Sequence, residues 1–125
     1  MSQLYLFALA SQKANWLHER QELVAENVAN VNMPGYKATD MKPFSVLLDE
    51  AGEGLFTTNP AHFSLASSAA APERPEPTDA SETTLSGNSV SLEGEMVKLG
   101  DINRNLSLNT NIQRIFHQMV MSALK

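Results

Sequence analysis

The chain has 125 residues, a hydrophobic fraction of 42% and a formal net charge of −5, and a chain of this length forms one domain at most. It contains no cysteine, so disulfides and thiolate metal sites are excluded. Aromatic residues make up 6% of the chain, and a core of aliphatic side chains suits helices better than a β-sandwich. No segment approaches the length of a membrane span, and the first residues lack the pattern of a cleavable signal peptide.

The negative charge is concentrated in the middle of the chain. Residues 49–84 contain seven acidic residues and one basic residue, a charge of −6, whereas the rest of the chain sums to +1. A phosphate backbone would be repelled by the middle and only weakly attracted by the ends. We therefore expect no nucleic-acid partner.

An N-terminal helix is predicted over residues 1–32, because the first thirty residues contain neither Gly nor Pro and their apolar residues recur at helical spacing. One apolar stripe consists of Leu6, Ala10, Ala14, Leu17, Val24, Val28 and Val31, and a second of Tyr5, Leu9, Trp16 and Leu23. The opposite face carries His18, Glu19, Glu22 and Glu26. Two stripes cover about half of the helix surface. This pattern is consistent with a well-covered core helix or with a helix that contacts two or more neighbours in an assembly.

A turn and an extended arm are predicted over residues 33–65. Pro34 disfavours helix before it, so the first helix should end near Asn30. Residues 33–36 suit a type II turn, in which Gly35 supplies the positive φ. Beyond the turn we expect an extended chain with possible short β pairing around residues 55–66. A small apolar anchor in this arm would consist of Phe44, Val46, Leu47 and Leu48.

Residues 66–88 are interpreted as an acidic linker rich in Pro and Ser. Such a segment buries too little apolar surface to offset its ordering entropy. We expect it to be flexible or draped on a surface, and a recognition motif is the less favoured alternative.

A second helix is predicted over residues 89–125, with Ser91 as its N-cap and Glu93 and Glu95 in the favourable first turn. Its first apolar stripe consists of Leu92, Met96, Leu99, Ile102 and Leu106, and its second of Ile112, Ile115, Phe116, Met119 and Ala123. On a regular helix the second stripe is rotated by roughly 120–140° from the first, so the helix should bend or change partner. The fold class is therefore mainly α. Helix packing is assigned to Leu6, Leu17, Val24, Val28, Leu99, Leu106, Phe116 and Val120.

No constellation of residues suggests chemistry. His18, His62 and His117 lie in three separate segments, and none has the spacing of a metal site. The sequence lacks a nucleophile elbow and a Gly-rich phosphate loop, and its basic residues are not clustered. We expect no enzymatic activity, cofactor, metal or small-molecule substrate.

Residues 27–37 carry a specific motif, in which Asn-x-x-Asn closes the first helix and a Pro-Gly-Tyr-Lys turn follows. The motif resembles the N-terminal signature of the bacterial flagellar rod and hook family. Its matching residues are Asn27, Asn30, Pro34, Gly35, Tyr36 and Lys37. Met33 stands where the family usually has Thr, which removes a hydroxyl that could support the turn.

Residues 87–96 follow the pattern Gly-Asn-x-Val-x-Leu-x-x-Glu-Met, which resembles the proximal rod branch of that family. The matching residues are Gly87, Asn88, Val90, Leu92, Glu95 and Met96. The resemblance covers residues 4–50 and 85–125. The short chain also agrees, because hook and distal rod subunits carry additional outer domains.

This resemblance implies that the terminal helices pair as a coiled-coil-like inner layer of a hollow axial structure, which transmits torque and lines an export channel. Implied partners are copies of the chain, other flagellar rod subunits, a rod-base adaptor, the export gate and membrane ring proteins. The implied location is the basal body on the periplasmic side of the inner membrane, reached by type III export without a cleavable signal. The alternatives are another rod subunit, a soluble helical adaptor or export chaperone, or a small enzyme whose site is undetected.

Overall fold

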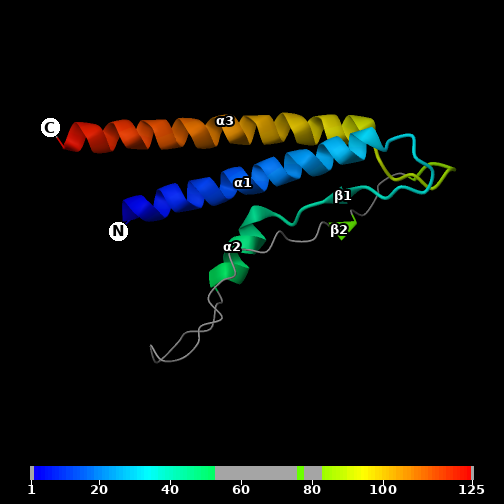
Figure 1. Ribbon diagram of the computed structural model, residues 1–125, viewed down its shortest axis with the longest axis horizontal. Coiled ribbons are helices and arrows are strands. Elements are labelled where there is room, and N and C mark those ends of the chain that lie inside the picture. The colour runs from blue at the N-terminus through cyan, green and yellow to red at the C-terminus, as the bar shows by residue number, and fades with distance from the viewer. Residues whose placement is uncertain (1, 53–75, 78–82, 125) are drawn as a thin grey trace, which may run out of the picture.

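The structure is a computed structural model that describes residues 2–52, 76–77 and 83–124. Its elements are the helices α1 (Ser2–Ala29), α2 (Phe44–Gly52) and α3 (Leu92–Ala123), and the short strands β1 (Thr39–Asp40) and β2 (Glu76–Pro77). The helices α1 and α3 lie side by side and antiparallel, so that the start of α1 and the end of α3 lie at the same end (Figure 1). The predicted mainly-α fold with two long terminal helices packed on each other is confirmed.

The end of α1 and the following turn have the predicted geometry. The helix ends at Ala29, and Gly35 has a φ of 74°. The Tyr36 N–H donates to the Met33 carbonyl over 3.3 Å, which closes a four-residue turn. Because the ring of Pro34 holds its φ negative, a positive φ at the next residue defines a type II turn.

Helix α3 begins as predicted and continues without interruption for 32 residues. Ser91 has an extended backbone and its side chain accepts a hydrogen bond from the Gly94 N–H, which satisfies one of the free donors at the helix start. Figure 1 shows α3 as a straight helix. The helix therefore does not bend at its rotated stripes. Of the second stripe, Phe116 packs against Phe7 of α1, whereas Ile112, Ile115 and Met119 are exposed.

The seam between α1 and α3 repeats in steps of three and four residues, as in a coiled coil. On α1 the seam positions include Leu6, Ala10, Leu17, Val24 and Asn27, and on α3 they include Glu95, Leu99, Ile102, Leu106, Asn109, Phe116 and Val120. The buried centre consists of Leu17, Val24 and Ile102, with Trp16, Leu99 and Leu106 packed against it. Leu6, Val28, Phe116 and Val120 are half-buried.

The predicted extended arm is wrong over residues 44–52, which form helix α2. The carbonyl of Pro43 accepts hydrogen bonds from the Val46 and Leu47 N–H groups over 3.0 and 3.4 Å, so the helix starts directly after a proline. The apolar residues here repeat at helical as well as at alternate spacing, and the contact of Phe44 with Trp16 (ring centroids 5.9 Å apart) favours the helix. Tertiary packing thereby overrides an ambiguous local pattern.

Two parts of the predicted linker are described. Strand β2 pairs antiparallel with β1, with Thr39 opposite Pro77 and Asp40 opposite Glu76, and residues 84–88 form a turn near the start of α3. The β pairing expected around residues 55–66 and the rest of the linker lie outside the described residues. Within the part of the chain that is described, no helix has the length and apolarity needed to cross a membrane.

Candidate functional site

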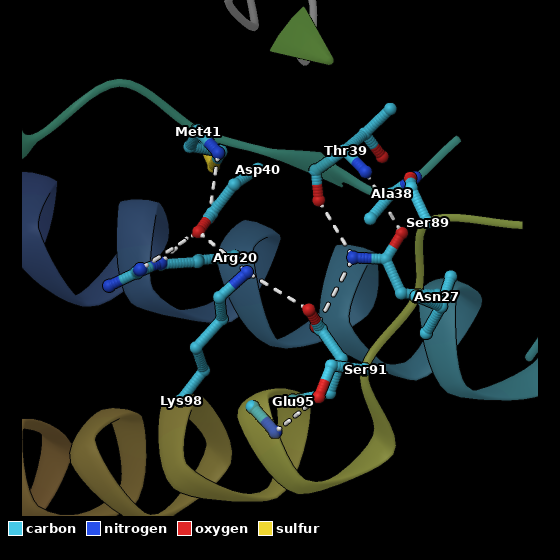
Figure 2. Close-up of polar contacts among 12 residues, drawn as sticks. Arg20, Asn27, Ala38, Thr39, Asp40, Met41, Ser89, Ser91, Glu95 and Lys98 are labelled. Atoms are coloured by element: carbon cyan, nitrogen blue, oxygen red, sulfur yellow. Dashed lines mark hydrogen bonds and ion pairs between the residues drawn. The ribbon is translucent and has the colours of Figure 1, made fainter. Parts of the chain in front are cut away.

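Asn27, in the last turn of α1, is the centre of a buried polar junction (Figure 2). Its side chain is 0% exposed. Its Nδ2 donates to the Thr39 carbonyl over 2.8 Å and to Glu95 Oε2 over 3.1 Å. Its Oδ1 accepts from the Thr39 N–H over 3.1 Å and from the Tyr36 hydroxyl over 3.3 Å. All four hydrogen-bonding positions of the amide are thus used, and they connect α1, the turn, β1 and α3.

Four charges of alternating sign extend the junction from α1 to α3 (Figure 2). Arg20 donates from Nε and Nη2 to the two carboxylate oxygens of Asp40 over 2.8 and 2.9 Å. Lys98 Nζ lies 3.3 Å from Asp40 Oδ2 and 2.9 Å from Glu95 Oε1. Glu95 is 3% exposed, so its charge depends on these partners. The four charges sum to zero, which suits a site shielded from water.

The pKa values of these groups follow from the same contacts. Burial on its own would raise the pKa of Asp40, but the hydrogen bonds from Arg20 and the Met41 N–H and the charges of Arg20 and Lys98 outweigh it, so the pKa is lowered. Burial would lower the pKa of Lys98, but Glu95 and Asp40 outweigh it and raise the pKa. Both groups are therefore held in their charged forms.

Asn88 joins the two signature segments, residues 27–37 and 87–96, at a second point. It is 2% exposed, and its Nδ2 donates to the carbonyls of Asn30 and Met33 over 2.9 and 2.7 Å. Its Oδ1 accepts from the Val90 N–H over 2.8 Å. One asparagine thus binds the end of α1, the following turn and the approach to α3.

The backbones of the two signature segments also touch directly. Gly35 and Gly87 both have positive φ, 74° and 81°, and a Cβ added to Gly87 would lie 3.5 Å from the Gly35 Cα. The Gly35 N–H donates to the Ser86 carbonyl over 2.9 Å, and the Ser89 N–H to the Tyr36 carbonyl over 3.0 Å. Lys37 Nζ lies 3.3 Å from the Gly87 carbonyl. Glycine is needed at both positions because other residues rarely adopt this φ.

Trp16, nearer the start of α1 than Asn27, contacts the segment of residues 37–44, which we call the arm from here on. Its Nε1 donates to the Lys42 carbonyl over 3.1 Å, its ring contacts Phe44, and the Arg20 guanidinium lies 5.4 Å from its centroid. Together with Thr39 and Asp40, this contact fixes the direction in which the arm leaves the helix pair.

The structure brings most of the predicted signature residues together. Those in or against the junction are Asn27, Asn30, Gly35, Tyr36, Lys37, Gly87, Asn88, Val90 and Glu95. Pro34 lies exposed in the turn. Leu92 and Met96 lie outside the junction on α3, 45% and 54% exposed.

Sequence reasoning missed Arg20, Asp40 and Lys98. One signal was available, because Arg20 stands three residues after Leu17 and four before Val24, in the apolar stripe where a charge needs a partner. Lys98 stands three residues after Glu95, a spacing at which helix side chains are neighbours, and the two form an ion pair. Asp40 has no such pattern, and only the folded chain brings it within reach of Arg20 and Lys98.

The junction connects α1, the turn after it, β1 and α3 through hydrogen bonds and ion pairs. Its polar atoms are occupied by one another, and within the described ranges no three His, Asp or Glu residues come together as a metal site. Fold and junction thus define a class of helical protein, in which the two terminal helices pair and buried polar contacts tie the end of the first to the start of the second.

The chain matches no protein-family model. It is 38% identical over 130 aligned residues to the flagellar basal body rod protein FlgB of Agrobacterium fabrum, an alignment that covers 100% of this chain and 96% of that protein. It is 39% identical over 74 residues to FlgB of Aeromonas hydrophila, covering 50% of this chain and 55% of that protein. The chain therefore belongs to the FlgB family of flagellar basal body rod proteins.

Proposed function

We propose that this chain is a structural subunit of the proximal rod of the flagellar basal body, and that it works by packing its terminal helices against neighbouring subunits. One observation carries this proposal: an exposed apolar stripe on the second half of α3, defined by Leu108, Ile112, Ile115 and Met119. These side chains are 53%, 44%, 53% and 55% exposed. Their spacing of four, three and four residues is that of a coiled-coil seam, and monomeric proteins rarely leave such a row uncovered.

The occupant of this stripe is an apolar helix face of an adjacent rod subunit, either a copy of the chain or another rod protein. In this arrangement α3 contacts α1 on one face and a neighbour on another, and it forms part of the inner layer of a hollow rod. The junction then holds the arm at a fixed angle to that layer. Torque transmission and lining of an export channel follow from the same role, which requires no catalytic group or cofactor.

The further partners we propose are the rod-base adaptor, the export gate and the membrane ring proteins, reached on the periplasmic side of the inner membrane after type III export. Membership of the FlgB family and the likeness of residues 87–96 to the proximal rod branch support this placement. The signature residues serve assembly in this proposal by fixing the shape of the subunit.

The test replaces Ile115 with Asp in a strain that lacks the gene and measures motility and recovery of the chain in isolated basal bodies. A charge in the stripe should abolish incorporation, because it would be buried without a partner. The matched control is Asn103→Asp, an exposed position of α3 on another face. Wild-type motility with Ile115→Asp would contradict the proposal.

A further inference from the structure

The second half of α3 has two faces that could receive α1, and the less apolar of the two is the one that does. The inner face carries Asn109, Gln113, Phe116 and Val120, and the outer face is the exposed apolar stripe of Leu108, Ile112, Ile115 and Met119. The two faces lie about 100° apart around the helix axis. Burial of apolar surface alone would favour packing of α1 on the outer face.

One polar contact holds α1 on the inner face. Asn109 is 9% exposed, and its Nδ2 donates to the carbonyl of Ala10 over 2.9 Å. Ala10 lies in the interior of α1, where its carbonyl already belongs to the helix's own hydrogen bonds and accepts the amide as a second donor.

The contacts in the first half of α3 lie too far along the helix to fix which face of the second half receives α1. Glu95 of the junction precedes Asn109 by fourteen residues, about 21 Å along the helix, and the buried centre around Ile102 lies between them. Beyond Asn109, Phe7 of α1 and Phe116 of α3 meet edge to face, with ring centroids 5.5 Å apart. Because α1 is one continuous helix, a tilt of α1 about the junction would carry its early part across α3.

We infer that Asn109 is a positioning residue that selects the inner face of α3 for α1 and so leaves the outer face free. A buried polar group at a seam position imposes one alignment, because other alignments leave it without a partner. If α1 lay on the outer face, the amide would lose the Ala10 carbonyl and the apolar stripe would be covered within the chain. That a neighbouring subunit uses the freed stripe rests on the proposed function, whereas the choice of face does not.

The inference is tested by the distance between spin labels on Gln12→Cys of α1 and Gln118→Cys of α3, which are exposed and the sole cysteines in the labelled chain. A swing of about 100° at a helix separation of 8–10 Å displaces α1 by about 12–15 Å, toward the side of α3 that carries residue 118. Pulsed electron paramagnetic resonance resolves this change. The variants are Asn109→Leu and Asn109→Asp, with Thr110→Leu as the control on a neighbouring exposed position.

We expect the wild type and Thr110→Leu to share one main distance. Both Asn109 variants should add a shorter one and associate less at a given concentration, since their stripe is covered. Asn109→Asp isolates the hydrogen bond, because a carboxylate cannot donate to the Ala10 carbonyl.

An unchanged distance in both variants, or a change in Asn109→Leu alone, would overturn the inference. Loss of helical circular dichroism in both variants would also overturn it, since Asn109 would then be required for pairing itself. A broad distribution of spin-label distances in the wild type, with no main distance, would overturn the inference as well. Loss of motility in Ile115→Asp alongside unchanged distances in the Asn109 variants would separate failure of this inference from failure of the proposed function.

Discussion

At the scale of single residues, Asn27 shows why an amide occupies the end of α1. It offers two donors and two acceptors in one short side chain, and its four partners come from the backbone of Thr39 and the side chains of Tyr36 and Glu95. A carboxylate would place a second negative charge beside Glu95, and an apolar residue would leave all of these partners unsatisfied.

We predict that Asn27→Leu lowers the helical content and the thermal midpoint of the protein. Each buried polar group left without a partner costs about 1–3 kcal/mol, and this variant removes the partner of groups on Thr39, Tyr36 and Glu95. Circular dichroism measures the effect, and Asn15→Leu, an exposed asparagine of the same helix, is the control. Equal losses in the two variants would show that the four bonds contribute nothing specific.

A second residue-scale prediction concerns pH. Because the pKa of Asp40 is lowered in the folded chain, its stabilising effect is present above its unfolded pKa of about 3.9 and is lost as the pH falls through the folded value. Because the pKa of Lys98 is raised, its effect is complete below about 10.4 and is lost as the pH rises through the folded value. The junction should therefore hold the arm most firmly between these limits.

The single tryptophan makes this measurable, since Trp16 contacts the arm at Lys42 and Phe44. Its fluorescence should change on acidification of the wild type, and this change should be strongly reduced in Asp40→Asn. Asp49→Asn, an exposed position of α2, should behave like the wild type. An acid transition that survives unchanged in Asp40→Asn would assign it to another group.

At the scale of elements, the turn after α1 sets the direction of the arm. Its backbone meets the turn of residues 84–88 through Gly35 and Ser86, so a change of conformation at one turn displaces the other. The strain of a substitution at Gly35 comes from the backbone alone, because an added Cβ meets no atom within 4 Å.

We predict that Gly35→Val impairs rod assembly more than Tyr36→Phe does. A β-branched residue at positive φ costs about 1–3 kcal/mol, and every subunit of an assembly would carry this strain. Tyr36→Phe removes one 3.3 Å hydrogen bond to Asn27, worth about 0.5–1.5 kcal/mol. Complementation of a null strain, scored by motility, compares the two directly. Full activity of Gly35→Val would show that the turn geometry does not matter.

At the scale of the whole molecule, contacts between distant parts of the sequence determine the fold. Asn27 reaches Glu95, Asn30 reaches Asn88 and Ala10 reaches Asn109, so these contacts of α1 form only after the last segment of the chain is present. Long loops must close before these contacts form, and among the described residues few buried apolar side chains offset that cost.

We therefore predict that the isolated chain is unevenly ordered. Amide hydrogen exchange at low concentration should be slowest near the junction and the centre around Ile102, and faster toward the free ends of α1 and α3. Protection of these ends should rise as the protein associates through the exposed stripe. Uniform strong protection in dilute solution would contradict this expectation, and so would protection that is independent of concentration.

The sequence by itself determined the two terminal helices, the N-cap at Ser91 and the turn with positive φ at Gly35. The reason is that helical periodicity, capping and turn chemistry act between residues close together in the chain. The resemblance of its two motifs to flagellar rod proteins also came from sequence alone.

Only the tertiary structure decided which side chains of the two motifs contact one another and which other residues join them. Asp40 gains its importance from Arg20 and Lys98, which are 20 or more residues away along the chain, and no local sequence pattern predicts that these three side chains meet. The sequence does not predict helix α2, because its apolar residues fit the spacing of a helix as well as that of a strand. The contact of Phe44 with Trp16 favours the helix. The choice of an inner face for α1 is of the same kind, because hydrophobicity favours the other face and one hydrogen bond between Asn109 and Ala10, 99 residues apart, opposes it.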